Sequence, residues 1–120
     1  MNKSPLKGEI WLINFEPARE GELGKQKRPS IVFQANDGNK FIDTVTLIPL
    51  SSDIDQYNEI HTLLKPSKTN GLRKHSAAIC SHIYTVSKNR LIKKIGTLNQ
   101  QEMETVTRAV ILHLDIDVLI

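Results

Sequence analysis

The chain has one cysteine, Cys80, and no long apolar run. A single cysteine excludes an intrachain disulfide and weakly favours a reducing compartment. A transmembrane helix needs about 20 consecutive apolar residues, and no stretch of this chain approaches that length. The N-terminal residues include a lysine but no apolar stretch behind it, so no signal peptide is expected. We therefore expect a cytoplasmic protein that does not cross a membrane.

The motifs of several enzyme classes are also missing. There is no glycine-rich phosphate loop, no His-x-x-x-His pair and no Gly-x-Ser-x-Gly nucleophile motif. The four histidines, His61, His75, His82 and His113, lack the spacing of metal ligands. We therefore expect neither a catalytic metal nor a cofactor. Cys80 lies in an apolar stretch and is expected to be a buried core residue.

Length and composition indicate a single domain over residues 1–120, with 39% hydrophobic residues to form one modest core. No repeat, low-complexity tract or linker interrupts the chain. Apolar and β-branched residues recur in short runs that predict strands. The expected strands are residues 8–15, 30–35, 43–50, 59–64 and 92–97, and residues 77–80 and 83–86 are expected to form one strand or a closely spaced pair.

One helix is expected at the C-terminal end. It should begin after Asn99, because Glu102 three residues later completes a capping-box pattern. The residues that recur at helical spacing and predict its core face are Met103, Val106, Val110 and Leu114.

Residues 37–40 predict a turn between two strands, so these strands should form a hairpin. Six or so short strands with one terminal helix predict a mainly β fold, a strongly bent antiparallel barrel. Parallel βαβ units are not expected, because the chain has too few helices for them.

Basic residues form three groups, and the net charge of +3 permits a polyanionic partner. The groups are Lys25, Lys27 and Arg28; Lys65, Lys68, Arg73, Lys74 and His75; and Lys88, Arg90, Lys93 and Lys94. Any one group could be a solvated surface. Three groups around one small domain favour a groove for RNA or DNA.

Arg28 is the first candidate for chemistry. It is expected where a basic loop meets a strand, with Pro29 restricting the backbone just after it. RNA can be cleaved without a metal, because the ribose 2′-OH can attack its own phosphodiester. The protein must then move protons and stabilise the extra negative charge on the phosphorane, and the planar fork of an arginine suits the second task. By itself, Arg28 could also form a structural ion pair.

Hydroxyl and imidazole groups are further candidates. Ser51 follows Pro49 and Leu50 at the end of an expected strand. Its hydroxyl could hydrogen-bond a phosphate oxygen or relay a proton, or it could only start a loop. His82 could act as an acid or base, because histidine titrates near neutrality, or it could be a surface residue.

The order and spacing of several short motifs resemble the MazF/PemK/Kid family of toxins. These motifs are Lys7-Gly8-Glu9-Ile10-Trp11, Pro17, Glu22-x-Gly24, Arg28-Pro29, Asn36-Asp37, Thr44, Pro49-Leu50-Ser51-Ser52, and the strand and helix from Ile83 to Leu114. The resemblance covers residues 5–115 and implies a CcdB/PemK-like, SH3-like barrel that forms a homodimer. It also implies a cognate antitoxin that blocks the RNA groove.

The implied activity is that of an mRNA interferase, a sequence-specific endoribonuclease that cleaves single-stranded RNA without a metal. Its products carry a 2′,3′-cyclic phosphate and a 5′-hydroxyl. The family's catalytic arginine falls on Arg28, and its hydroxyl residue, commonly threonine, falls on Ser51. Some members have an acidic residue near Ser81, and glutamine is common at the position of His82.

The sequence therefore predicts a growth-inhibiting toxin of a type II toxin–antitoxin system, with Arg28, Ser51 and His82 as catalytic residues. The expected RNA-binding residues are Lys25, Lys27, Ser52, Arg73, Lys74 and Ser81. Two alternatives are a CcdB-like toxin that poisons DNA gyrase and a nucleic-acid-binding module without catalysis.

Overall fold

The computed structural model describes residues 4–16, 27–54 and 62–117. The elements follow in the order β1 (Glu9–Asn14), β2 (Lys27–Val32), α1 (Asn36–Phe41), β3 (Thr44–Ser51), β4 (Thr62–Leu64), β5 (Ser76–Ala78), β6 (Tyr84–Ser87), the short 3₁₀ helix η2 (Lys88–Arg90), β7 (Leu91–Thr97) and α2 (Gln100–Leu114). The predicted fold class, mainly β with a C-terminal helix, is confirmed.

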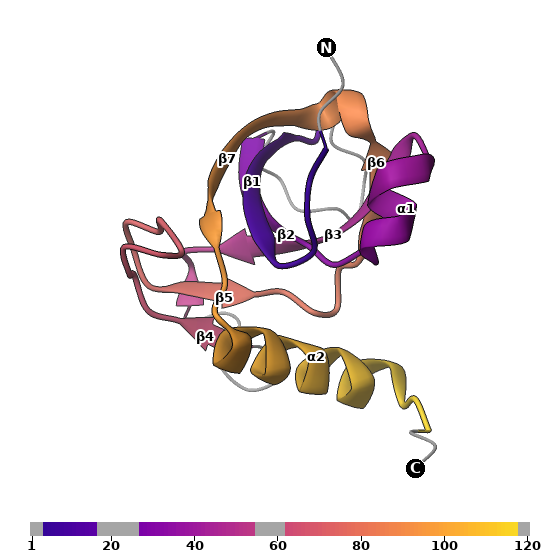
Figure 1. The fold of residues 1–120 in the computed structure, drawn as a ribbon. Helices are drawn as coiled ribbons and strands as arrows, with labels where there is room; N and C mark the ends of the chain where they lie inside the picture. Colours follow the sequence, from indigo (N-terminus) through magenta and orange to yellow (C-terminus); the bar gives the residue numbers. More distant parts are fainter. Residues whose placement is uncertain (1–3, 17–26, 55–61, 118–120) are drawn as a thin grey trace.

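Within the described residues, the strands form one antiparallel sheet of seven strands in the order β4-β5-β3-β2-β1-β7, and β6 also pairs with β3. β3 joins the two parts of the sheet, since it pairs with β2 along one edge and with β6 and then β5 along the other. Figure 1 shows β1, β2, β3, β6 and β7 curling around one another, with β4 and β5 lying between this curl and α2. The predicted bent barrel is therefore confirmed.

Two hydrophobic clusters of described residues stabilise this arrangement. The cluster associated with α2 brings together Ile10, Ile31, Ile48, Leu50, Leu64, Ala78, Cys80, Leu98, Val106 and Val110. The second cluster contains Ile13, Val32, Val45, Leu47 and Leu91, with Trp11, Phe15 and Val86 packed against it. Ile10 and Ile13 both belong to β1 but contribute to different clusters. The sheet therefore has apolar packing on more than one face, which accounts for runs that alternate only partly.

The predicted turn at residues 37–40 is wrong in its local structure. The segment forms the helix α1, although β2 and β3 on either side pair antiparallel as expected. Asn39 explains the helix, because its buried side-chain amide donates to the carbonyl of Gln34 and to Oδ1 of Asn36. Turn-forming composition alone does not distinguish a tight turn from a short helix that is closed by a buried amide.

One predicted boundary changed, because β2 begins at Lys27, earlier than predicted. The apolar stretch at residues 77–86 forms a closely spaced pair, β5 and β6, which is one of the two predicted alternatives. Of the predicted strand over residues 59–64, residues 62–64 form β4, and residues 59–61 lie outside the described part of the chain.

The predicted capping box at the N-terminus of α2 is confirmed. The side chain of Asn99 accepts from the backbone N–H of Glu102 at 2.7 Å, and Glu102 Oε1 accepts from the backbone N–H of Asn99 at 2.9 Å. Val106 and Val110 are buried as predicted, whereas Leu114 is half exposed because it lies in the last turn. In the described part of the chain, neither helix has the length and apolar character needed to cross a membrane.

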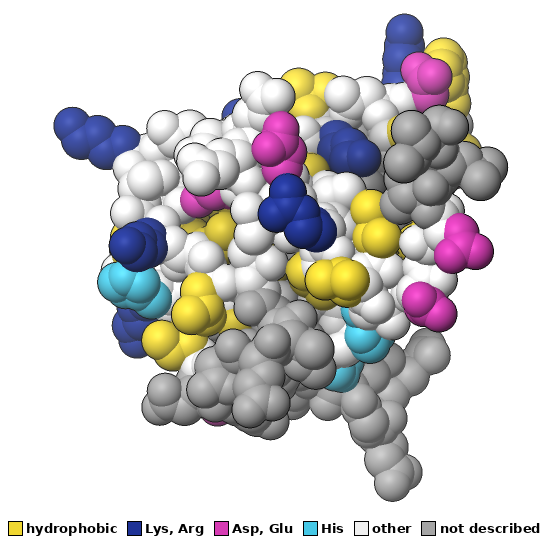
Figure 2. All heavy atoms as spheres, turned by 90° about the horizontal axis from the view of Figure 1, so that it is seen from below, with side chains coloured by type: hydrophobic (Ala, Val, Ile, Leu, Met, Phe, Trp, Pro, Cys, Tyr) yellow, Lys and Arg dark blue, Asp and Glu magenta, His cyan; other side chains and the backbone are white. Residues whose placement is uncertain are grey.

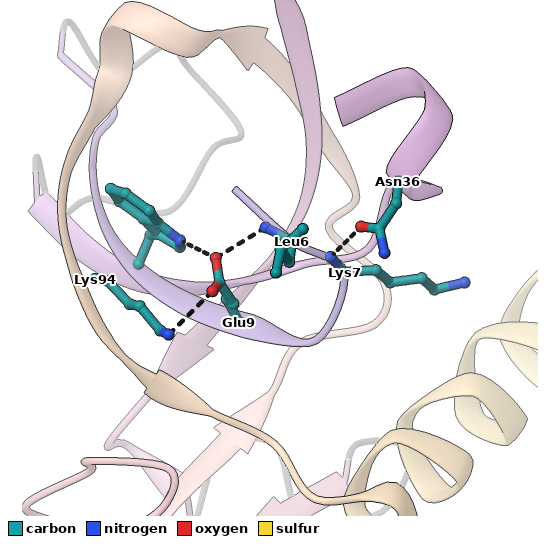
Figure 3. A network of polar contacts seen from close by, with 6 residues as sticks. Leu6, Lys7, Glu9, Asn36 and Lys94 are labelled. Carbon is teal, nitrogen blue, oxygen red and sulfur yellow. Dashed lines mark hydrogen bonds and ion pairs between the residues drawn. The ribbon is translucent and has the colours of Figure 1, made fainter. Parts of the chain in front are cut away.

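Glu9 ties the N-terminal segment to β7 (Figure 3). Its carboxylate accepts from the backbone N–H of Leu6 at 2.8 Å and from the indole N–H of Trp11 at 3.0 Å, and it forms an ion pair with Lys94 at 3.0 Å. Burial raises the pKa of Glu9, but these hydrogen bonds and the charge of Lys94 outweigh burial, so the pKa lies below its ordinary value of 4.5. The ionised carboxylate therefore stabilises the folded state.

The substitution Glu9→Gln tests this linkage. We expect the free energy of unfolding near neutral pH to fall by about 1–3 kcal/mol, because a buried charged acceptor is lost. A lowered pKa in the folded state stabilises the protein above pH 4.5, and this contribution is lost as the pH falls through the folded pKa. The difference between wild type and variant should therefore shrink in acid. Denaturant unfolding over a pH series measures it, with the exposed Glu104→Gln as control, and a difference that does not vary with pH would contradict it.

Candidate functional site

A pocket of about 570 Å³ lies among the start of β2, the end of β3, the loop between β4 and β5, and β7. Its described lining residues are Leu12, Lys27, Arg28, Pro29, Leu50, Ser52, Gly71, Leu72, Arg73, Lys74, Ser76, Lys93, Lys94 and Ile95. Three of these segments, β2, the loop between β4 and β5, and β7, contribute basic side chains to the pocket. None of the described lining residues is acidic. This composition favours an anionic ligand.

The pocket lies where β2 and β3 stop pairing. Their ladder ends at the pair Ser30 and Pro49, beyond which β3 pairs with β5 on its other edge. The next residue of β2 beyond this pair is Pro29, which precedes Ser30 in the chain. A proline has no N–H to donate to a ladder. The guanidinium of Arg28 bridges the two strands instead, with Nη1 donating to the carbonyl oxygen of Leu50 at 3.0 Å.

The burial of Arg28 corrects the sequence prediction. Arg28 was expected at the end of a loop, but it is the second residue of β2, is paired with Ile13 of β1, and is only 6% exposed. The strand backbone and the bond to Leu50 therefore hold the guanidinium in one orientation at the pocket wall. A charged group held in a site with little water acts more strongly on a nearby anion than the same group in solution.

The two serines at the end of β3 differ in position. Ser51 is buried, and its Oγ accepts from the backbone N–H of Asp53 at 3.1 Å. Ser52 is exposed and lines the pocket, whereas Ser51 does not. Ser51 therefore shapes the turn that presents Ser52.

Ser81 and His82 lie in the segment between β5 and β6, and neither lines the pocket. Ser81 Oγ lies 3.0 Å from His82 Nδ1. The imidazole is 6.3 Å from the ring of Tyr84, which in turn packs at 5.2 Å from Phe15. The structure thus places this pair beside an aromatic group, apart from the lining residues.

The structure brings together five of the predicted site residues, namely Lys27, Arg28, Ser52, Arg73 and Lys74. Lys25 lies outside the described part of the chain. Figure 2 shows Lys, Arg and His side chains standing out along the left edge, the side on which the loop between β4 and β5 projects in Figure 1.

The sequence does not mark Lys93 and Lys94 as site residues, although both belong to its third basic group. Consecutive residues of a regular strand point to opposite faces. β7, however, shifts register against β1 on either side of these two lysines, and both line the pocket. Lys94 is paired with Glu9, and Lys93 is an exposed lysine of the same wall. Their position in a strand next to β1 could not be read from charge alone.

Cys80 is fully buried, as predicted, and its environment suppresses nucleophilic chemistry. Burial raises the pKa of the thiol to about 11, so the thiolate is scarce near neutral pH. Among the described residues, no group of three His, Cys, Asp or Glu side chains is placed to hold a metal ion.

The sequence of the chain matches the family of PemK-like, MazF-like toxins of type II toxin–antitoxin systems over residues 6–114. The chain belongs to this toxin family. It is 30% identical over 115 residues to endoribonuclease MazF9 of Mycobacterium tuberculosis, which covers 92% of this chain and 96% of that protein. It is also 30% identical over 105 residues to endoribonuclease MazF of Staphylococcus saprophyticus, covering 87% of this chain and 86% of the relative.

Solved structures share the fold of this toxin. MazF from Deinococcus radiodurans superposes with a TM-score of 0.80 at 18% identity, covering 96% of this chain and 100% of that one. A mycobacterial endoribonuclease solved in complex with its cognate antitoxin superposes with a TM-score of 0.74 at 19% identity, covering 99% and 100%. The family resemblance read from the motifs is confirmed, and the alternative of a gyrase-poisoning toxin is not favoured.

The buried thiol gives a direct test of the packing between β5 and α2. We expect Cys80 in the folded toxin not to react with a thiol reagent such as DTNB at about pH 8, because it is inaccessible and protonated. In denaturant, the same thiol should react fully, which serves as the control. Rapid reaction of the folded toxin would show that this part of the core opens readily.

Proposed function

We propose that this toxin is a metal-independent endoribonuclease that cleaves single-stranded mRNA at specific sequences in the cytoplasm. The basic pocket supports this proposal most directly, because it combines a fixed, buried Arg28 with Lys27 beside it and with lysine and arginine side chains from two further segments, the loop between β4 and β5 and β7. The two relatives named as endoribonucleases, each 30% identical, also support it. Cleavage would halt translation and inhibit growth.

The RNA supplies its own nucleophile in this proposal. The ribose 2′-OH attacks the adjacent phosphorus, the bond to the leaving 5′ oxygen breaks, and a 2′,3′-cyclic phosphate and a 5′-hydroxyl result. Negative charge grows on the phosphorane, and the guanidinium of Arg28 stabilises it. Because Arg28 is already held by the carbonyl of Leu50, little reorganisation is needed at the moment of reaction.

Ser51 and His82 are proposed to assist Arg28. The hydroxyl of Ser51 accepts from the N–H of Asp53 and still has its own proton to donate to a phosphate oxygen. Ser81 engages Nδ1 of His82, so Nε2 is the ring nitrogen proposed to exchange a proton with the substrate. Both roles require the bound RNA to extend beyond the residues that line the pocket.

The remaining residues are proposed to bind the RNA strand, whose bases are read as they splay apart. They are Lys25, Lys27, Ser52, Arg73, Lys74 and Ser81. We also propose that the active form is a homodimer and that a cognate antitoxin inhibits it by covering the basic pocket with an acidic, extended segment.

Substitutions of Arg28 test the catalytic assignment. Removing one preorganised donor to a developing oxyanion typically costs about 10²–10³ in kcat. We expect a loss of this size in Arg28→Ala and a smaller loss in Arg28→Lys, which keeps the charge but not the planar fork. Cleavage of a long, weakly structured RNA is followed in EDTA, with the ends mapped by primer extension.

The burial of Arg28 makes a folding control necessary. Thermal unfolding should show that at least the lysine variant folds, and the exposed Arg108→Ala should cleave like wild type. Full activity in a folded Arg28 variant would contradict the assignment of Arg28. Failure of the folded wild type to cleave RNA in EDTA would contradict the proposed function itself.

Lys93 provides a separate test of RNA binding at the pocket. We expect Lys93→Gln to weaken binding and to reduce the slope of log K against log salt by about 0.7, the value for one phosphate contact with a single strand. Titrations over a salt series would use 2′-O-methyl RNA. This RNA has no free 2′-OH to act as the nucleophile, so the toxin cannot cleave it. The matched control is Lys40→Gln on the exposed surface of α1, and equal slopes for both variants would exclude Lys93 from the interface.

A further inference from the structure

A fully buried asparagine organises the loop between β4 and β5. Asn70 is 0% exposed. Its Oδ1 accepts from the backbone N–H groups of Ser67 and Leu72, each at 3.0 Å. Its Nδ2 donates to the carbonyl of Lys65 at 2.8 Å and to Glu102 Oε2 at 3.1 Å. The amide thus uses its two donors and accepts two bonds, which is its full hydrogen-bonding capacity.

Glu102 connects this loop to α2. One carboxylate oxygen completes the capping box with the N–H of Asn99, and the other accepts from Asn70. The same side chain therefore fixes the first turn of the helix and the position of the loop. Glu102 was predicted from the sequence only as a capping residue.

The backbone of the loop lies directly on β7. The N–H of Thr97 donates to the carbonyl of Thr69 at 2.8 Å. Gly71 has a φ of +70°, and a Cβ at this position would lie 2.2 Å from the carbonyl oxygen of Ile95. A Cβ at Gly96 would lie 2.3 Å from the backbone carbonyl of Asn70. No side chain fits between the two segments, so the path of the loop is narrowly defined.

The four residues that follow Asn70 reach the pocket. Gly71, Leu72, Arg73 and Lys74 line it, together with Lys93, Lys94 and Ile95 of β7. Arg73 and Lys74 are exposed, and they belong to a loop that has no strand ladder of its own before β5. Without an anchor, ordering such a loop would oppose RNA binding, because each immobilised side chain loses conformational entropy.

We propose that Asn70, held by Glu102, is a positioning residue that presents Arg73 and Lys74 to the RNA backbone across the pocket from Arg28. This inference rests on the proposed ribonuclease function and adds a residue to it. Asn70 lies behind the loop and acts through the two basic residues, so its loss should weaken RNA binding more than the chemical step.

The substitution Asn70→Asp tests this role with little change in shape. The new carboxylate cannot donate to the carbonyl of Lys65 or to Glu102, and it repels both. We expect KM for RNA to rise about tenfold, the equivalent of one lost charged contact, while kcat changes by less than about threefold. Adding Glu102→Gln supplies an amide that can donate back to the carboxylate, so the double variant should recover part of the lost affinity.

A double-mutant cycle separates positioning from general stability. If Asn70 acts through Arg73 and Lys74, Asn70→Asp should raise KM by less than about twofold in a protein that already carries Arg73→Gln and Lys74→Gln. Additive effects on KM would overturn the inference. The matched control is Asn36→Asp in α1, where the side chain serves as an acceptor for the N–H of Lys7 and where KM should not change.

Two further outcomes are decisive. If Asn70→Asp does not fold, the single variant Glu102→Gln takes its place in the test. Glutamine can still complete the capping box with Asn99, but it has only one acceptor oxygen in place of the two of the carboxylate, one of which accepts from Asn70. An unchanged KM in that folded variant would overturn the inference. If wild type does not cleave RNA, the proposed function fails. The same cycle is then measured as the affinity for 2′-O-methyl RNA, where additivity would overturn the role of Asn70 independently.

Discussion

The hydrogen bond from Arg28 to the carbonyl of Leu50 spans the point where β2 and β3 separate, and the pocket is arranged around it. Two prolines lie at this point, Pro29 on β2 and Pro49 on β3. Because prolines cannot donate to a ladder, the strands can part here, and a side chain replaces the backbone pairing. The same bond that closes the sheet therefore also orients the proposed catalytic cation.

Two carboxylates make the basic walls of the pocket compatible with a stable fold. Glu9 pairs with Lys94 and ties β7 to the N-terminal segment, and Glu102 holds Asn70 and thereby the loop that bears Arg73 and Lys74. Neither carboxylate lines the pocket. Acidic groups placed behind the walls stabilise the framework while the pocket itself keeps a positive potential for an anionic ligand.

Local sequence patterns predicted an element well where an interaction between residues close in the chain decides its structure. The capping box of Asn99 and Glu102 involves residues three apart, and both of its bonds are present. The prediction of a turn at residues 37–40 was wrong, because the buried amide of Asn39 closes a helix there. Arg28 was placed in the correct region but in the wrong environment, since its burial depends on a partner 22 residues away.

The sequence by itself determined the family, the mainly β fold with its capped terminal helix, and most of the basic residues at the pocket, because motif order, apolar periodicity and charge are local properties of a chain. Only the tertiary structure decided which of these residues meet. The pairing of β7 with β1 places Lys93 and Lys94 at the pocket beside Arg28, and the contact of Asn70 with Glu102 joins segments 32 residues apart. Such convergence depends on strand register and on long-range packing, and neither is encoded in the spacing of neighbouring residues.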